Sequence, residues 1–85
     1  MNNKLEIFKK KLIYRASYRG TKEMDMLLSK FVNKYINLWN ESYLKELEEF
    51  LDYEDEVILN YYRDNIKKNG IEKYKISEIF KNFKI

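Results

Sequence analysis

Apolar side chains recur every three or four residues along nearly the whole chain, and this spacing most constrains the fold. The longest run predicts a helix over residues 22–38, where Met24, Leu27, Leu28, Phe31, Tyr35 and Leu38 share one face and Val32 lies beside them. No segment alternates apolar and polar residues as a half-buried strand does. The 85 residues include no proline and only two glycines, which favours helices with few breaks. We therefore predict an all-α protein.

Four further apolar stripes predict a bundle of five helices. They are Leu5, Phe8, Leu12 and Ala16 in residues 4–18; Leu44, Leu47, Phe50 and Leu51; Val57, Ile58, Tyr61 and Tyr62; and Ile76, Ile79, Phe80 and Phe83. Asn40 or Ser42 can cap the third helix, the acidic run 52–55 can cap the fourth, and Asn69-Gly70 predicts a turn before the last. A chain of this length makes one domain. We expect residues 1–85 to form a compact single-domain five-helix bundle.

The composition excludes several kinds of functional site. The chain has no cysteine and no histidine, which removes disulfides, thiolate nucleophiles, the usual zinc and copper ligands and the commonest general base. No spacing of carboxylates suggests a metal site. We therefore predict no catalytic residue, no metal ligand and no enzymatic activity.

The ends and the hydropathy of the chain bear on its location. The segment Met1-Asn2-Asn3-Lys4-Leu5-Glu6 has no long apolar run after a basic start, so no signal peptide is expected. No stretch approaches the ~20 apolar residues that span a membrane. From the sequence we expect a soluble, cytoplasmic monomer that does not insert into membranes.

The net charge is only +3, but the charges are unevenly placed. Residues 1–22 carry seven basic side chains and one acidic one, whereas residues 41–56 carry eight acidic side chains and one basic one. This asymmetry can orient a partner, or one helix face can complement another. The run Lys9-Lys10-Lys11 beside Phe8 and Tyr14 leaves a nucleic-acid-binding or antitoxin-like regulatory module as the alternative function. Because three successive lysines fan out around a helix and no recognition motif accompanies them, we favour no nucleic-acid partner.

The corner between the first two predicted helices carries a compact polar motif, Arg19-Gly20-x-x-Glu23. A guanidinium pairs well with carboxylates, and a glycine permits both a positive φ and close backbone approach. Such a corner can lock two helices together or present a polar patch to a partner. The residue types leave both roles open.

The stretch Arg19-Gly20-Thr21-Lys22-Glu23-Met24-Asp25-Met26-Leu27-Leu28 resembles the motif of the succinate dehydrogenase assembly factor family, which is Arg-Gly-x-x-Glu followed by Asp and an apolar run. The resemblance spans roughly residues 8 to 65. It implies a helical protein that binds the flavoprotein subunit of succinate dehydrogenase, here called the client, and promotes its covalent attachment of FAD. The related fumarate reductase flavoprotein is a second expected client. FAD would be held by the client, and no cofactor by this chain.

The resemblance also implies which residues meet the client. The motif residues Arg19, Gly20 and Glu23 would form the client-binding patch together with Asp25, which we expect to face solvent. Arg15 and Tyr18 would flank it, whereas Tyr14 and Ser17 can pack inward instead. The chain departs from the family pattern near the fourth helix, where Glu56 or a neighbour replaces a usual proline and Tyr61 replaces a frequent tryptophan. We therefore assign that region to the scaffold.

Overall fold

The computed structural model describes residues 3–85 and contains five α-helices and one short 3-10 helix. The elements are α1 (Asn3–Ser17), α2 (Lys22–Tyr35), α3 (Glu41–Phe50), α4 (Asp55–Asp64), η1 (Ile71–Lys73) and α5 (Lys75–Lys81). The described residues form no strand. The predicted all-α fold of five helices is confirmed, and the 3-10 turn before α5 is an addition to it.

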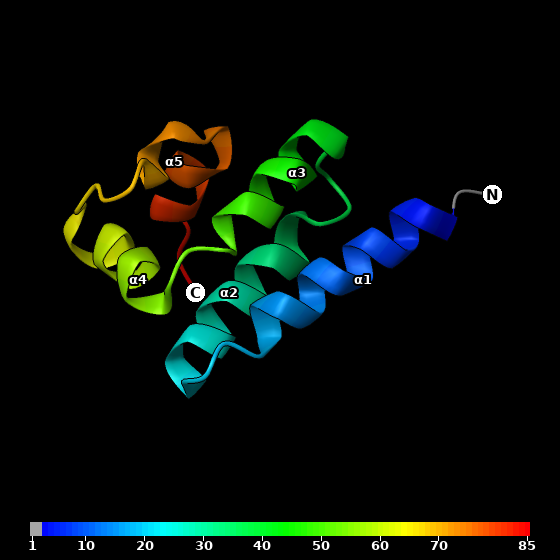
Figure 1. Cartoon of the computed structure of the whole chain (residues 1–85). Helices are drawn as coiled ribbons and strands as arrows, with labels where there is room; N and C mark the ends of the chain where they lie inside the picture. The colour runs from blue at the N-terminus through cyan, green and yellow to red at the C-terminus, as the bar shows by residue number, and fades with distance from the viewer. Residues whose placement is uncertain (1–2) are drawn as a thin grey trace.

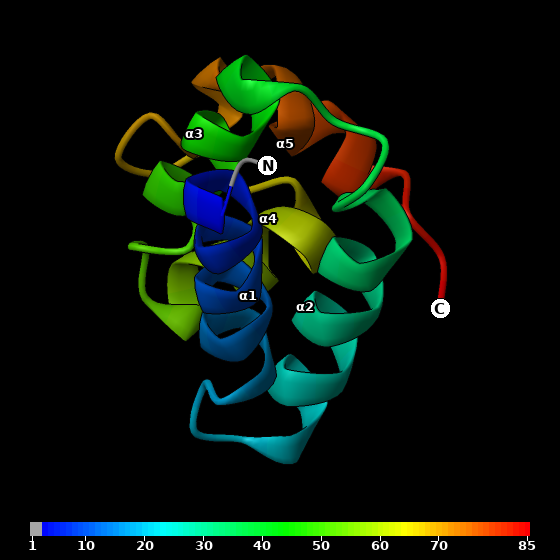
Figure 2. The ribbon, with the colours of Figure 1, turned by 90° about the vertical axis from the view of Figure 1, so that its right-hand side faces the viewer.

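The helices α1 and α2 form an antiparallel pair, joined by a short turn at one end of the molecule (Figures 1 and 2). The helix α3 runs beside them, and α4 and α5 cover the end of α3 that is remote from the N-terminus (Figure 1). The first turns of α1 project beyond the other helices, so the molecule measures 42 Å along its longest axis and only 26 and 21 Å across. The face of α1 that carries Ile7, Lys10 and Tyr14 is exposed to solvent.

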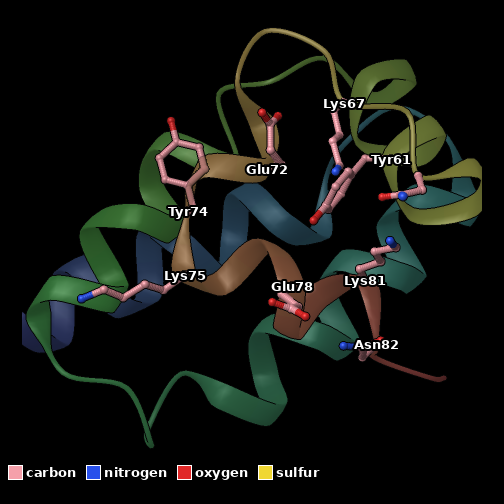
Figure 3. Close-up of a pocket in the computed structure, with 9 residues that line it drawn as sticks. Tyr61, Lys67, Glu72, Tyr74, Lys75, Glu78, Lys81 and Asn82 are labelled. Atoms are coloured by element: carbon pink, nitrogen blue, oxygen red, sulfur yellow. The ribbon is translucent and has the colours of Figure 1, made fainter.

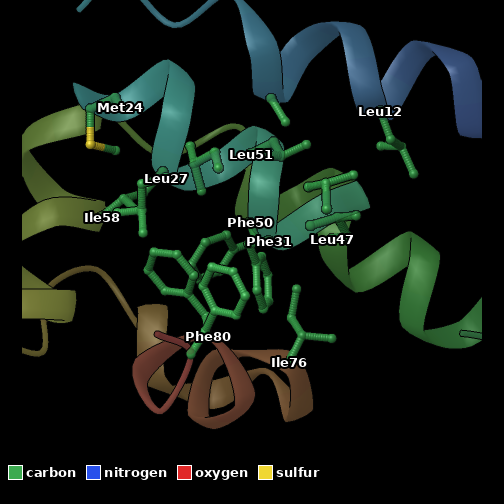
Figure 4. Packing of buried hydrophobic residues seen from close by; sticks show 14 of the residues in the cluster. Leu12, Met24, Leu27, Phe31, Leu47, Phe50, Leu51, Ile58, Ile76 and Phe80 are labelled. Atoms are coloured by element: carbon green, nitrogen blue, oxygen red, sulfur yellow. The ribbon is translucent and has the colours of Figure 1, made fainter. Parts of the chain in front are cut away.

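The core lies where α2, α3 and α5 meet (Figure 4). The rings of Phe31, Phe50 and Phe80, one from each of these helices, are fully buried, and the ring centroid of Phe80 lies 4.9 Å from that of Phe31 and 5.2 Å from that of Phe50. Edge-to-face packing of large rings supplies apolar area that a chain of this size otherwise lacks. The predicted stripes supply most of the buried side chains.

The predicted end of the second helix was wrong. The helix α2 stops at Tyr35, three residues early, and Leu38 is 75% exposed. The backbone tightens there, because the amides of Leu38 and Trp39 both donate to the carbonyl of Tyr35, at 2.9 and 3.1 Å. This turn buries Ile36 and stacks the ring of Trp39 on that of Tyr35, with the centroids 4.9 Å apart. Ile36 and Trp39 therefore take the packing role that the spacing assigned to Leu38.

The turn signals were mostly confirmed, with one exception. The side chain of Asn40 caps α3 by accepting from the amide of Tyr43, and Asn69 and Gly70 both adopt positive φ in the predicted turn. The acidic run 52–55 does not cap α4 through a side chain, because the N-cap residue Glu54 makes no such hydrogen bond. Asp52 and Asp55 accept hydrogen bonds from arginines near the end of α1 instead.

Candidate functional site

The turn between α1 and α2 is fixed by its own residues. Thr21 caps α2, its hydroxyl oxygen accepting from the amide of Met24 at 3.3 Å. Gly20 has φ +123°, a conformation that L side chains rarely adopt. A Cβ added at Gly20 would meet nothing within 4 Å. Glycine is therefore required for the backbone conformation and not for lack of space, and the surface above it is open.

The side chain of Arg19 points into the fold. Its Nε donates to Asp55 at 2.8 Å, and its Nη1 and Nη2 donate to the carbonyls of Leu51 and Tyr53, both at 2.7 Å. Only 11% of this side chain is exposed. The last carbonyls of a helix lack partners within the helix and carry partial negative charge. Arg19 thus caps the end of α3 and ties it to the start of α4.

Arg15, one turn earlier, supports the same end of α3. The last turn of α3 has no basic residue and carries Glu48 and Glu49. Negative charge at the C-terminal end of a helix is disfavoured by the helix dipole. Arg15 pairs with Asp52 just beyond the helix and donates to the carbonyl of Glu48 at 3.4 Å. Part of the charge asymmetry in the sequence is therefore satisfied inside the molecule.

Asp25 also belongs to the scaffold of the turn, and the prediction that it faces solvent was wrong. Its carboxylate accepts the backbone N–H of Arg19 at 2.5 Å, and the residue is half-buried. The turn folds back over the first turn of α2, which brings that amide to the carboxylate. This contact and the Thr21 cap hold the two ends of the turn together.

Tyr18 and Glu23 face outward from the same turn. The ring of Tyr18 is 69% exposed and packs on that of Tyr14, which is 64% exposed, with the centroids 4.6 Å apart. Tyr14, left open by the sequence, therefore points outward, whereas Ser17 is half-buried and its hydroxyl donates to the carbonyl of Ile13. Glu23 pairs with Arg63 of α4, and about half of each side chain is exposed.

The six predicted site residues thus separate into two groups on one corner. Arg15, Arg19 and Asp25 make contacts within the fold, whereas Tyr18, Gly20 and Glu23 form an outer face. The sequence did not single out Thr21 or Arg63. A threonine directly before a helical stripe is a capping signal that could have been used. The pairing of Arg63 with Glu23 spans 40 residues and has no local signal.

A hollow of about 340 Å³ lies between the end of α4 and α5 (Figure 3). Burial, and then the charges of Glu78 and Glu72, raise the pKa of Tyr61 at its wall above the usual value. Lysines and glutamates share this wall and partly cancel in charge. Among residues 3–85 no group of three or more carboxylates is placed to hold a metal ion.

Comparison with known proteins identifies the family. Residues 10–84 match the family described as flavinator of succinate dehydrogenase. The chain is 37% identical over 78 residues to "Succinate dehydrogenase assembly factor 2, mitochondrial" of Scheffersomyces stipitis, which is 91% of this chain and 52% of the relative. It is 37% identical over 71 residues to the protein of that name from Schizosaccharomyces pombe, covering 84% of this chain and 50% of the relative. No solved structure matches the chain.

These relatives also bear on location and extent. All of those compared carry the word mitochondrial in their names, which overturns the expectation of a cytoplasmic protein. The chain spans about half the length of the curated relatives that it matches. No helix in the described part of the chain is long and apolar enough to cross a membrane. By the match over residues 10–84 and by these relatives, the chain belongs to the succinate dehydrogenase flavinator family of assembly factors.

Proposed function

We propose that this chain binds the flavoprotein subunit of succinate dehydrogenase and promotes the covalent attachment of FAD to it. The description of the family names flavinylation, and the names of the relatives specify assembly of succinate dehydrogenase. The observation that carries the proposal is the Arg-Gly-x-x-Glu motif at the α1–α2 corner, where Gly20 and Glu23 lie on an open outer face. The names of the relatives support a mitochondrial location.

The chemistry available to the chain supports a non-enzymatic role. In the proposed role the client holds FAD and provides the residue that becomes bonded to it, and the absence of histidine and cysteine from this chain is consistent with that division. The chain then acts as a monomer that holds a client conformation in which the acceptor residue and the flavin are well placed. Correct placement of reacting groups is worth up to about 7–11 kcal/mol of barrier in ideal intramolecular cases. The fumarate reductase flavoprotein is a second proposed client.

The two groups of corner residues have different proposed roles. Tyr18, Gly20 and Glu23 contact the client, because their side chains or backbone are open to solvent. A large amphipathic ring such as that of Tyr18 is enriched at protein interfaces. Arg15, Arg19 and Asp25 act as positioning residues, since their polar groups bond within the fold. The motif thus contributes to client binding both directly and through the shape of the corner.

The alternative function, nucleic-acid binding, has less support. Two of the seven basic residues near the N-terminus, Arg15 and Arg19, pair with Asp52 and Asp55. Those pairs place carboxylates beside the basic side of α1, where a phosphate backbone would be repelled. Protein recognition remains the favoured function.

A flavinylation assay tests the proposal. Purified apo-flavoprotein is incubated with FAD, with and without the chain, and covalent FAD is read as fluorescence of the denatured client band. We expect faster attachment with the chain present, a reduced effect with Tyr18→Ala, and an unchanged effect with Lys30→Ala on the exposed surface of α2 as the control. Equal rates of attachment with and without the chain would refute the proposed function.

A further inference from the structure

A groove runs along the seam between α1 and α3. It consists of two adjoining hollows of about 290 and 410 Å³ that share Phe8. The first is bounded by Lys4 and Lys45, and the second extends to Arg15 and Glu48. At 1.5 Å per helical residue, the 11 steps from Lys4 to Arg15 correspond to a length of ~16 Å. We call this feature the α1–α3 groove.

The floor and one edge of the α1–α3 groove are apolar. Leu5, Phe8 and Leu12 follow one another at helical spacing on the floor, and the first two are only partly buried. Ile7 and Tyr14 lie two turns apart on a neighbouring face of α1, Tyr18 follows the end of the helix, and each is more than half exposed. Exposed apolar side chains beside a partly buried apolar floor are typical of an interaction surface.

The rim of the α1–α3 groove carries an excess of positive charge. Lys4, Lys11 and Lys45 are exposed and form no ion pair within residues 3–85, and Glu41 and Glu48 are the acidic residues on the rim. Arg15 is already engaged by Asp52. The rim therefore favours an occupant with acidic side chains beside its apolar ones.

We propose that the α1–α3 groove binds an amphipathic helix of the client flavoprotein, with its apolar face on the floor and acidic side chains beside the lysines. The inference rests on the proposed function and extends the contact from the α1–α2 corner along α1. Leu5, Phe8 and Leu12 stand at positions i, i+3 and i+7 of α1 and form a floor between α1 and α3. A groove of this kind between two helices accepts a ridge of side chains from a third helix. About three turns of helix fill a groove of ~16 Å. A second copy of this chain fits less well, because two identical grooves would face each other with the same excess of positive charge.

Site-specific cross-linking tests the occupant. Because the chain has no cysteine, Lys11→Cys can be labelled at one position with a benzophenone maleimide and irradiated in complex with the apo-flavoprotein. Lys10→Cys is the matched control, since Lys10 is exposed on the same helix and lines neither hollow. We expect the Lys11 label to capture a client peptide that combines apolar and acidic residues, and the Lys10 label to capture little or none.

Three results would overturn the proposal while leaving the proposed function intact. They are a stable complex in which the Lys11 label captures no client peptide, capture of a peptide without acidic residues, and capture of a second copy of this chain. If the unmodified chain binds no flavoprotein, the proposed function and the groove proposal both fail. The two failures are thus distinguishable in one experiment.

Charge reversal provides a second readout that does not depend on labelling. The double variant Lys11→Glu, Lys45→Glu should bind the client roughly tenfold more weakly and with a smaller salt dependence, because rim charges steer association. The control Lys10→Glu, Lys30→Glu has the same net charge and changes exposed lysines outside the groove. Equal affinities of the two double variants would contradict the proposal.

Discussion

The α1–α2 corner has an inner and an outer face, built by residues that lie within one short stretch of sequence. On the inner face, Arg19 makes three side-chain hydrogen bonds to the segment between α3 and α4, and Asp25 accepts the backbone N–H of Arg19. On the outer face, Tyr18 packs on the exposed ring of Tyr14, and Glu23 pairs with Arg63, about half of which is exposed. The difference shows that the two charged residues of one motif have different tasks. Arg19 builds the corner, and Glu23 is presented by it.

The largest expected effect separates the faces through Arg19. Replacing it with alanine leaves Asp55 and the carbonyls of Leu51 and Tyr53 without their donor, so the free energy of unfolding should fall by about 2–3 kcal/mol. Chemical denaturation measures the loss. Arg19→Lys should recover only part of it, because an ammonium lacks the planar fork that reaches all three acceptors. A stability equal to that of the unmodified chain would place Arg19 on the outer face instead.

A smaller loss of stability is expected at Gly20, which lies on the outer face. Gly20→Ala should cost about 1–2 kcal/mol of unfolding free energy through backbone strain alone, since the added methyl meets no neighbour. The affinity of the folded Gly20→Ala variant for the client should also fall, because the client approaches this open position. If Gly20→Ala is less stable but binds the client as tightly as the unmodified chain, the client contacts the side chains around Gly20 and not the backbone at Gly20 itself.

For Tyr18, stability and binding should change by very different amounts. Tyr18→Ala removes the packing on Tyr14 and should lower the unfolding free energy by about 0.5 kcal/mol or less. Client affinity should fall by about 2 kcal/mol, as for an aromatic residue central to an interface. Leu38→Ala is the control, because Leu38 is a large exposed apolar side chain beyond the other end of α2. Similar affinities of the two variants would remove Tyr18 from the contact surface.

The smallest change in stability is expected at Glu23. Its pair with Arg63 is about half exposed, so Glu23→Gln should alter the unfolding free energy by less than about 0.5 kcal/mol. If a basic residue of the client replaces Arg63 as partner, calorimetric titration should show binding weakened by about 1–3 kcal/mol. Arg63→Gln removes the internal partner and should not weaken binding in this way. An unchanged affinity of Glu23→Gln would leave the outer face without a charged contact.

The sequence predicted the helices far better than the division of the corner into two faces. Spacing identified all five apolar stripes and placed Gly20 in the turn, because helical periodicity and the conformational freedom of glycine are local properties. The end of α2 was missed because the tight turn that buries Ile36 instead of Leu38 depends on the stacking of Trp39. The direction of Arg19 could not be predicted, since its acceptors lie 32 to 36 residues away. Two of them are backbone carbonyls, which no residue type reveals.

Hydrogen–deuterium exchange of the chain, free and bound to the apo-flavoprotein, tests the central claim most directly. We expect the amides of residues 18–23, in the turn that carries the outer face, to exchange more slowly in the complex. Amides around the hollow between α4 and α5 should exchange at the same rate in both states. Protection confined to that hollow, with residues 18–23 unchanged in a stable complex, would contradict the assignment of the outer face to the client.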